Sequence, residues 1–236
     1  MRPPLRDAPS ASAAARGQTA APAPALRPPG GDVLPSEMLA HLNSLGFSPS
    51  NSQTQTPSAL LGTNEVLAAT ALTHESWMYG MHGHNRRLAF LGRRVLKTYL
   101  TLFLYNALAA AGADAEYLAK FLASPKGVDE VLTTQHLGDH VGRALRLEKV
   151  MRWLPATNLD TTQRERGTGL FKVRGTCVEA VVGAIYHHRG AQIAQQFFLS
   201  RVLPHLELIT QESPPAMRER IAQASKEATE ALSYSP

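Results

Sequence analysis

Cysteine is nearly absent from this 236-residue chain, which contains one, Cys177. A single thiol cannot form an intramolecular disulfide framework, and such scarcity is typical of proteins from a reducing compartment. No motif around Cys177 indicates a nucleophile, so we expect a small, buried, apolar residue at this position. Small secreted folds held together by disulfides are therefore excluded.

Long apolar runs and strand patterns are also missing. The most apolar uncharged stretch, residues 98–113, spans 16 residues and contains Thr98, Thr101 and Asn106, so it is short and polar for a membrane-spanning helix. The sequence has no clear alternating run and no Asn-Gly or Asp-Gly hairpin turn. We therefore expect a soluble, all-α protein without a membrane span, built as one domain with extensions.

Acidic residues are scarce at the N-terminus, and this explains most of the net charge of +5. Residues 1–31 hold one acid, Asp7, and four bases: Arg2, Arg6, Arg16 and Arg27. The rest of the chain has 20 basic and 18 acidic residues, a net charge of +2. Overall charge is therefore weak support for nucleic-acid binding, and the case for such binding depends on where the charges cluster along the chain.

The first 58 residues read as an arm and a linker. Residues 1–31 combine arginine and serine with almost no acid, which is typical of a mitochondrial targeting segment. Their seven prolines oppose a continuous amphipathic helix, so a disordered arm is the alternative. Residues 32–58 are expected to form a short helix capped by Ser36, followed by a polar linker over 48–58.

Hydrophobic residues spaced three and four apart predict a helical body over residues 59–210. Its first helix is expected to be capped by Thr63 and to turn Val66, Leu67, Ala71 and Leu72 inward. The other predicted helices cover 85–111, 115–123, 128–145, 170–188 and 191–203, with a polar loop over 155–169 and a left-handed cap at Gly190. Residues 211–236 are expected to form a docking helix with an apolar stripe at Met217, Ile221, Ala224, Ala228 and Leu232.

Two segments carry a family resemblance. Residues 71–96 contain Leu72-Thr73-His74, Phe90-Leu91-Gly92 and Val95-Leu96, and residues 175–190 contain Glu179-Ala180 and Gly183-Ala184-Ile185-Tyr186. In content, order and spacing they resemble the catalytic domain of the ribonuclease III family. The resemblance covers roughly residues 60–205. It implies the all-α ribonuclease III endonuclease-domain fold, and a paired arrangement of two such chains.

The residues that would carry the family's chemistry are mostly replaced. Members of the family hold a divalent metal with four carboxylates, and the resemblance places those positions on Ala89, Arg93, Thr176 and Glu179, of which only Glu179 is acidic. Mg²⁺ requires oxygen ligands. A guanidinium about 4 Å away instead repels the divalent ion by roughly 8 kcal/mol at an effective dielectric of 20. We therefore expect no catalytic residue, no bound metal and no cofactor.

Arg93 has two arrangements open to it. It can occupy the vacated metal position and pair with Glu179, or it can point outward to a partner or an RNA phosphate. A separation of the two charged groups beyond about 6 Å would exclude the pairing. His74 is expected to be structural, and Trp77 and Trp153 are expected to be packing residues.

Local charge predicts one basic surface. Residues 143–174 contain eight bases against Glu148, Asp160 and Glu165, a local charge of +5. Long basic side chains beside a polar loop can reach phosphates, and no base-reading motif is evident, so we expect sequence-nonspecific contact with an RNA backbone. A solvated basic face is the alternative. The candidate RNA-binding residues are Arg143, Arg146, Lys149, Arg152, Arg164, Arg166, Lys172 and Arg174.

The resemblance without the metal ligands implies a non-catalytic use of the fold. About 30 residues follow Leu206, too few for the double-stranded-RNA-binding domain of bacterial members, which a subunit fixed in a large assembly does not need. Together with the candidate targeting segment, the chain resembles the non-catalytic ribonuclease III-like proteins of the mitochondrial ribosome's large subunit. This resemblance implies a structural component of that subunit, in the matrix, binding rRNA, neighbouring proteins and a second ribonuclease III-fold chain. The alternatives are an active mitochondrial double-strand-specific endoribonuclease completed by a partner chain, and a free RNA-binding assembly factor.

Overall fold

The computed structural model describes residues 33–46, 59–109, 115–124, 127–155, 168–208 and 215–234. The described residues are helical, which confirms the all-α prediction, and their one β-bridge, between Thr73 and Arg152, is isolated. The candidate targeting segment, the polar linker and most of the 155–169 loop lie outside the described residues. None of the described helices combines the length and the hydropathy needed to cross a bilayer.

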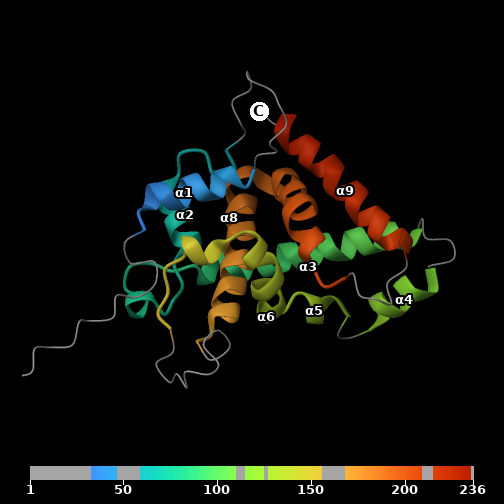
Figure 1. The fold of residues 1–236 in the computed structure, drawn as a ribbon, viewed down its shortest axis with the longest axis horizontal. Coiled ribbons are helices and arrows are strands. Elements are labelled where there is room, and N and C mark those ends of the chain that lie inside the picture. Colours follow the sequence, from blue (N-terminus) through green and yellow to red (C-terminus); the bar gives the residue numbers. More distant parts are fainter. Residues whose placement is uncertain are drawn as a thin grey trace, which may run out of the picture.

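The helices follow one another in a simple order (Figure 1). The N-terminal half comprises α1 (Pro35–Ser44), α2 (Glu65–Leu72), η1 (Trp77–Gly80), α3 (Arg86–Ala109), α4 (Ala115–Ala123) and α5 (Gly127–Val131). The rest comprises α6 (Thr134–His136), η3 (Leu137–Gly142), η4 (Leu147–Lys149), α8 (Leu170–Phe197), η6 (Phe198–Val202), η7 (Leu203–His205) and α9 (Pro215–Tyr234).

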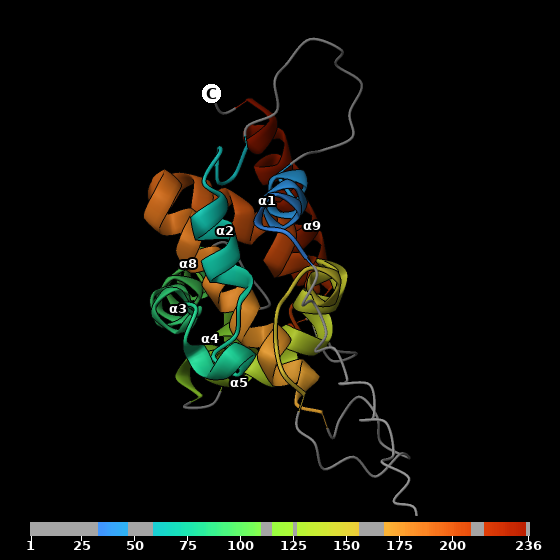
Figure 2. The same cartoon turned by 90° about the vertical axis from the view of Figure 1, so that its left-hand side faces the viewer.

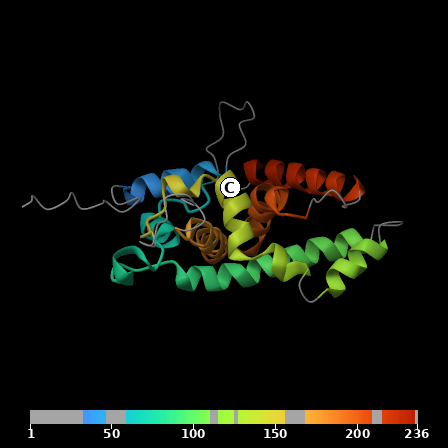
Figure 3. The same ribbon diagram turned by 60° about the horizontal axis from the view of Figure 1, so that its bottom comes forward.

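Helix α8 lies at the centre of the body. It is flanked by α3 on one side and by α1 and α9 on the other, as the turned views show (Figures 2 and 3). From Val173 to Ile185, every residue of α8 except Thr176 is buried. A helix that is buried on nearly every face belongs to the core, so α8 and the long α3 that crosses it form the frame of the fold.

Glycines allow α3 and α8 to cross closely. A β-carbon at Gly92 would lie 1.7 Å from the carbonyl oxygen of Glu179, and one at Gly183 would lie 2.1 Å from the carbonyl oxygen of Leu88. No side chain fits at either position, because heavy atoms that are not bonded to each other do not approach so closely. The glycines of the two matching segments are therefore packing residues, and their contact brings residue 179 against the first turns of α3.

The helix ends differ in detail from the sequence expectation. The α1 helix begins at Pro35 and not at a Ser36 cap, because the Glu37 carboxylate accepts the Leu34 N–H at 2.9 Å. In α2 the cap is Asn64, whose Oδ1 accepts the Leu67 N–H at 3.0 Å, so the prediction of Thr63 was wrong. The predicted inward residue Val66 is 77% exposed.

One predicted helix is broken and another is longer than expected. Residues 128–145 form α5, α6 and η3 because Thr133 is extended (φ −61°, ψ 145°) and its hydroxyl accepts the His136 N–H to start a new helix. The α8 helix continues to Phe197 through a kink at Gly190, where φ is 81°. The hydroxyl of Tyr99 donates to the carbonyl oxygen of Ala191 at 2.7 Å and so ties α3 to the kink.

The C-terminal helix docks on the body of its own chain. In α9, Met217, Ile221, Ala228 and Leu232 are buried, and Ala224 is half-buried, as the apolar stripe predicted. The helix packs on α8 and η6, and its Ser225 hydroxyl donates to the carbonyl oxygen of Ser200 in η6 at 3.4 Å. An apolar stripe at helical spacing is enough to drive such docking.

Candidate functional site

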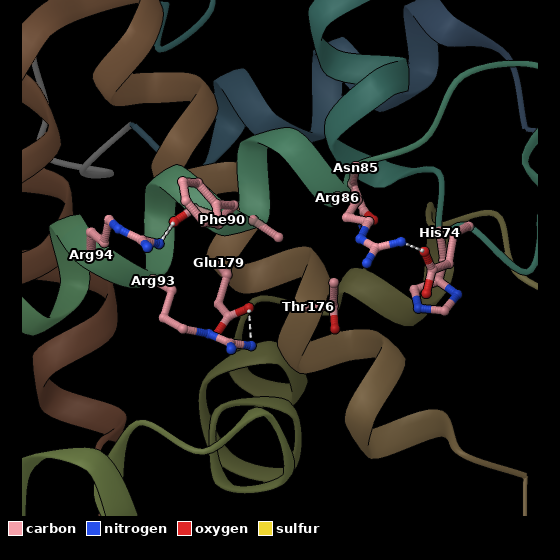
Figure 4. Close-up of a pocket in the computed structure, with 10 residues that line it drawn as sticks. His74, Asn85, Arg86, Phe90, Arg93, Arg94, Thr176 and Glu179 are labelled. Carbon is pink, nitrogen blue, oxygen red and sulfur yellow. Dashed lines mark hydrogen bonds and ion pairs between the residues drawn. The ribbon is translucent and has the colours of Figure 1, made fainter.

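The four positions that the family resemblance assigns to metal ligands meet in one cleft. Ala89 and Arg93 lie one turn apart on α3, and Thr176 and Glu179 lie one turn apart on α8 (Figure 4). All four line a cleft of about 420 Å³ between the two helices. The close crossing at the glycines brings these four positions together, although only Glu179 among them carries a carboxylate.

Arg93 pairs with Glu179 through two parallel contacts. Its Nε donates to Oε1 at 2.8 Å and its Nη2 donates to Oε2 at 3.2 Å. The side chain of Glu179 is 1% exposed and that of Arg93 is 61% exposed, so the arginine reaches inward from the mouth of the cleft to a carboxylate in its floor. Of the two arrangements that the sequence left open, the structure shows the pairing, with bidentate geometry.

The pair decides the electrostatics of the cleft. Burial raises the pKa of the Glu179 carboxyl above its ordinary value, and the hydrogen bonds and charge of Arg93 oppose that rise. In turn the hydrogen bond and charge of Glu179 raise the pKa of Arg93. The surviving carboxylate is thus neutralised by a covalently attached cation, and both of its oxygens are occupied.

The residues present do not fit a divalent metal. In the described part of the chain, no group of three or more His, Cys, Asp or Glu side chains could hold a metal ion. The other carboxylate at the cleft is Glu75, which pairs with Arg86 at 3.6 Å. Mg²⁺ binding needs several oxygen ligands that are not already neutralised, and Ala89 and Thr176 supply no carboxylate.

The polar residues at the end of the cleft support the backbone. Nδ1 of His74 accepts the N–H of Ser76 at 3.1 Å, and burial lowers the pKa of His74, so the ring is neutral and structural at pH 7. Asn85 is buried and donates to the carbonyl oxygen of Ala71 and to Sγ of Cys177, each at 3.4 Å. Burial raises the pKa of Cys177 to about 12, which suits an inert core residue.

The eight candidate RNA-binding residues divide into four groups, of which the last is the buried Arg174. Arg143, Arg146, Lys149 and Lys172 are exposed, and Arg143 also pairs with Asp139 at 2.6 Å. Arg152 is half-buried and donates to the carbonyl oxygen of Val33. Arg164 and Arg166 lie outside the described residues.

Arg174 is a correction to the predicted basic surface. It is buried, its Nε donates to the carbonyl oxygen of Gly138, and its Nη1 lies 3.3 Å from the Glu148 carboxylate. Its guanidinium also lies over the ring of Phe171, 5.6 Å from the centroid. These contacts hold α8 to η3 and η4, so this buried side chain is not on the basic surface.

Counting charges along the chain could not separate Arg174 from its exposed neighbours, because it carries no information on helix orientation. A cation–π contact on α3 was also missed from the sequence, in which the guanidinium of Arg94 lies 3.5 Å from the ring centroid of Phe90. The i,i+4 spacing of these two residues is the signal that could have revealed it.

Comparison with known proteins identifies relatives of two kinds. A family model described as Ribonuclease-III-like matches residues 64–206, which is more than half of the chain. Large ribosomal subunit protein mL57 of Neurospora crassa is 29% identical over 149 residues, covering 58% of this chain and 53% of that protein. Ribonuclease 3 of Clostridium perfringens is 28% identical over 138 residues, covering 58% and 52%. Ribonuclease 3 of Moorella thermoacetica is 28% identical over 149 residues, covering 61% and 56%, so the chain spans about half the length of these relatives.

Proposed function

This chain belongs to the ribonuclease III-like family, and we propose that it is a non-catalytic member that serves as a structural component of the mitochondrial ribosome's large subunit. In this role it binds rRNA and neighbouring ribosomal proteins in the matrix, and pairs with a second chain of the same fold. The similarity to a large ribosomal subunit protein supports membership of that subunit. The composition of residues 1–31 supports location in the mitochondrial matrix.

The observation that carries the non-catalytic role is the Arg93–Glu179 pair in the floor of the cleft. Metal-assisted hydrolysis of a phosphodiester needs a bound ion that activates water and stabilises the charge that develops. Here a guanidinium already uses both oxygens of the one buried carboxylate that the cleft retains. The fold therefore persists as a scaffold, and its surfaces carry the function.

The exposed bases outside the cleft suit contact with rRNA. Arg146, Lys149 and Lys172 are solvent-exposed, and none of them forms an ion pair within the described residues. Flexible bases that extend into solvent bind phosphates without reading sequence, and each neutralised phosphate makes the affinity more dependent on salt.

Sedimentation through sucrose gradients at several salt concentrations tests the assembly. A tagged copy of the full chain, expressed in its own cells, is expected to travel with the large ribosomal subunit and to stay bound at high salt. The variant Arg146→Glu/Lys149→Glu/Lys172→Glu is expected to be released at lower salt, because three phosphate contacts become repulsions. Release of the wild type at low salt, or its sedimentation apart from the subunit, would instead indicate a free assembly factor.

An active nuclease is the second candidate, because two Ribonuclease 3 proteins match the chain about as well as the ribosomal protein does. The discriminating assay is cleavage of duplex RNA by the purified chain, alone and in complex with its mate, with Mg²⁺ and with EDTA. We expect none. Magnesium-dependent cleavage that disappears in Glu179→Gln would disprove the non-catalytic role.

Restoring the carboxylates tests whether ligand loss is the reason for inactivity. The variant Ala89→Glu/Arg93→Asp/Thr176→Asp places acids at the three altered positions around Glu179, which already share one cleft. Because hard divalent ions need such oxygens, the variant is expected to bind Mn²⁺ in a calorimetric titration, whereas the wild type is not. Saturable binding by the wild type would contradict this account of the cleft.

A further inference from the structure

A second cleft lies at the end of the molecule where α3 begins. There α1, α2 and the turn that contains η1 come together (Figure 1). The cleft has a volume of about 270 Å³ and shares no lining residue with the cleft of Arg93 and Glu179. We refer to it as the α2 cleft, because α2 forms one of its walls. Its volume suits one small ring system and not a drug-sized ligand.

Arg152 lines the α2 cleft with a guanidinium that is only partly used. Its backbone is fixed on both sides, because its N–H donates to the carbonyl oxygen of Leu72 at 2.8 Å and its carbonyl oxygen accepts the N–H of His74 at 2.9 Å. In the side chain, Nη2 donates to the carbonyl oxygen of Val33, but Nε is buried without an acceptor. No carboxylate of the described residues pairs with this guanidinium. Because a buried donor without a partner costs stability, we expect the acceptor to come from another molecule.

The α2 cleft also contains an acid and an aromatic ring. Glu65 is exposed in the first turn of α2, and its carboxylate has no hydrogen-bond or ion-pair partner in the part of the chain that the structure describes. Trp77 is half-buried at the start of η1. The next two residues, Met78 and Tyr79, have φ angles of 46° and 56°, in the left-handed region that side chains rarely adopt. Backbone strain of this kind clusters at binding sites, so the turn that begins with Trp77 is a candidate binding element.

An aromatic ring, a hydrogen-bond acceptor and a hydrogen-bond donor in one small cleft match the chemistry of guanine. This base presents two donors on one edge, N1–H and the N2 amino group, and two acceptors on the next edge, O6 and N7. A carboxylate only accepts hydrogen bonds and a guanidinium only donates them. Adenine instead has a lone pair at N1 and an amino group in place of O6, so it would oppose both protein groups.

We propose that the α2 cleft binds an unpaired guanine of RNA. Trp77 stacks on the base, Glu65 accepts hydrogen bonds from N1–H and the N2 amino group, and Arg152 donates to O6 or N7. Pairing in a duplex would occupy the edge that Glu65 contacts, so the guanine belongs to a bulge, a loop or an end. The inference rests on the proposed function for contact with RNA, and it adds a base-specific site to the backbone contacts.

Other occupants match the α2 cleft less well. An apolar side chain of a protein would fill the space but would leave Nε of Arg152 without an acceptor. A free guanine nucleotide offers the same base, but its phosphates need several donors, and the bases that line the cleft are Arg152 and His82. RNA instead gains further affinity from phosphate contacts elsewhere on the chain.

Fluorescence anisotropy with labelled RNA hairpins tests the site. The probes are three hairpins of the same stem: one with a single bulged guanine, one with a bulged adenine, and one that is fully paired. The full chain is expected to bind the first at least about 10-fold more tightly than the other two, because stacking and two matched edges contribute only there. A bulged inosine, which lacks the N2 amino group, should fall between guanine and adenine.

Two variants separate the edge contacts from stacking. Glu65→Ala should reduce the preference for guanine over adenine to about 2-fold or less, because the acceptor is lost. Glu130→Ala is the matched control, since Glu130 is also an exposed, unpaired acid but does not line the α2 cleft, and it should keep the preference. Trp77→Leu should lower the affinity for the bulged-guanine hairpin to that for the paired one. Circular dichroism checks that each variant is folded.

The variant Arg146→Glu/Lys149→Glu/Lys172→Glu provides the comparison with backbone contact. It is expected to weaken the binding of all three hairpins by the same factor, because phosphates are common to them. Equal binding of the three hairpins by the wild type, together with this uniform loss, would overturn the base site and leave the proposed function intact. Failure of the chain to sediment with the ribosomal subunit would remove the proposed function and leave a guanine preference standing.

Competition identifies the source of the ligand. Unlabelled bulged-guanine hairpin should displace the labelled hairpin at a concentration at least about 100-fold below that of guanosine 5′-monophosphate, because only the RNA carries the additional phosphate contacts. Equal displacement by the free nucleotide would overturn the assignment to RNA. Displacement by N-acetyl-leucinamide as readily as by the nucleotide would indicate a protein-docking cleft and would also overturn it.

Discussion

Removing Arg93 should leave a buried carboxylate without its cation. Glu179 is 1% exposed, and both of its oxygens accept hydrogen bonds from the guanidinium. Breaking a fully buried ion pair from one side costs about 3–5 kcal/mol. Because Arg93 is 61% exposed, solvent can enter after truncation and screen the charge. We therefore expect Arg93→Ala to lose about 2 kcal/mol of unfolding free energy at pH 8.

The loss should depend on pH in a defined direction. Without Arg93, burial acts unopposed and raises the folded-state pKa of Glu179 further above its unfolded value. A folded acid with a raised pKa binds its proton more tightly than the unfolded chain does, so stability falls as pH rises from the unfolded toward the folded pKa. The deficit of Arg93→Ala relative to wild type should thus be largest at pH 8 and shrink at pH 5.

Urea denaturation followed by far-UV circular dichroism at both pH values measures the effect. Adding Glu179→Gln to Arg93→Ala removes the unpaired charge and should recover most of the stability at pH 8. Arg94→Ala is the matched control, since Arg94 lies on the same helix without an acidic partner, and it should change stability by less than about 1 kcal/mol. An Arg93→Ala variant as stable as wild type at pH 8, or a deficit that grows on acidification, would refute the reasoning.

Other consequences follow from the same packing. Gly92→Ala should cost at least about 3 kcal/mol or prevent folding, because the new methyl group would overlap the carbonyl oxygen of Glu179; thermal denaturation that matches wild type would contradict the close crossing. Cys177, whose pKa burial raises to about 12, should not react with a maleimide at pH 8 until urea unfolds the chain, and fast labelling of the native protein would argue against that burial. Lys172→Ala should reduce the slope of log affinity for duplex RNA against log salt by about 1 without changing stability. Arg174→Ala should instead lower the free energy of unfolding by about 2–3 kcal/mol, because it leaves the carbonyl oxygen of Gly138 and the carboxylate of Glu148 without their partner. If Arg174→Ala reduced the salt slope of RNA binding and left stability unchanged, Arg174 would belong to the RNA surface after all.

Most helices were predictable because their signals are local. Apolar spacing located α3, α4 and α9 to within a few residues, and Gly190 was recognised as a break because only glycine adopts its backbone geometry without strain. The misplaced caps of α1 and α2 have a common cause. Several neighbouring residues could cap each helix, and the choice depends on how the preceding chain enters the helix.

The split of residues 128–145 could not be read from the sequence. The apolar pattern there is continuous, but Gly138 must approach the backbone of α8, with a notional β-carbon 1.7 Å from the carbonyl oxygen of Phe171. The chain restarts its helix at Thr133 and widens its turns in the π-helical η3, where Gly138 makes that contact. Tertiary packing therefore overrode local propensity in this segment.

The sequence by itself determined that only one of residues 89, 93, 176 and 179, the positions that the resemblance assigns to metal ligands, is acidic, because residue identity needs no coordinates once the family pattern is in register. Only the tertiary structure decided which residue pairs with that carboxylate. Whether Arg93 turned inward to Glu179 or outward to solvent depended on the α3–α8 crossing. In the same way, the contact between α8 and η3 decided that Arg174 is buried while its basic neighbours in the sequence are exposed. Charge is a property of the residue, but the partner of that charge is set by distances that only folding creates.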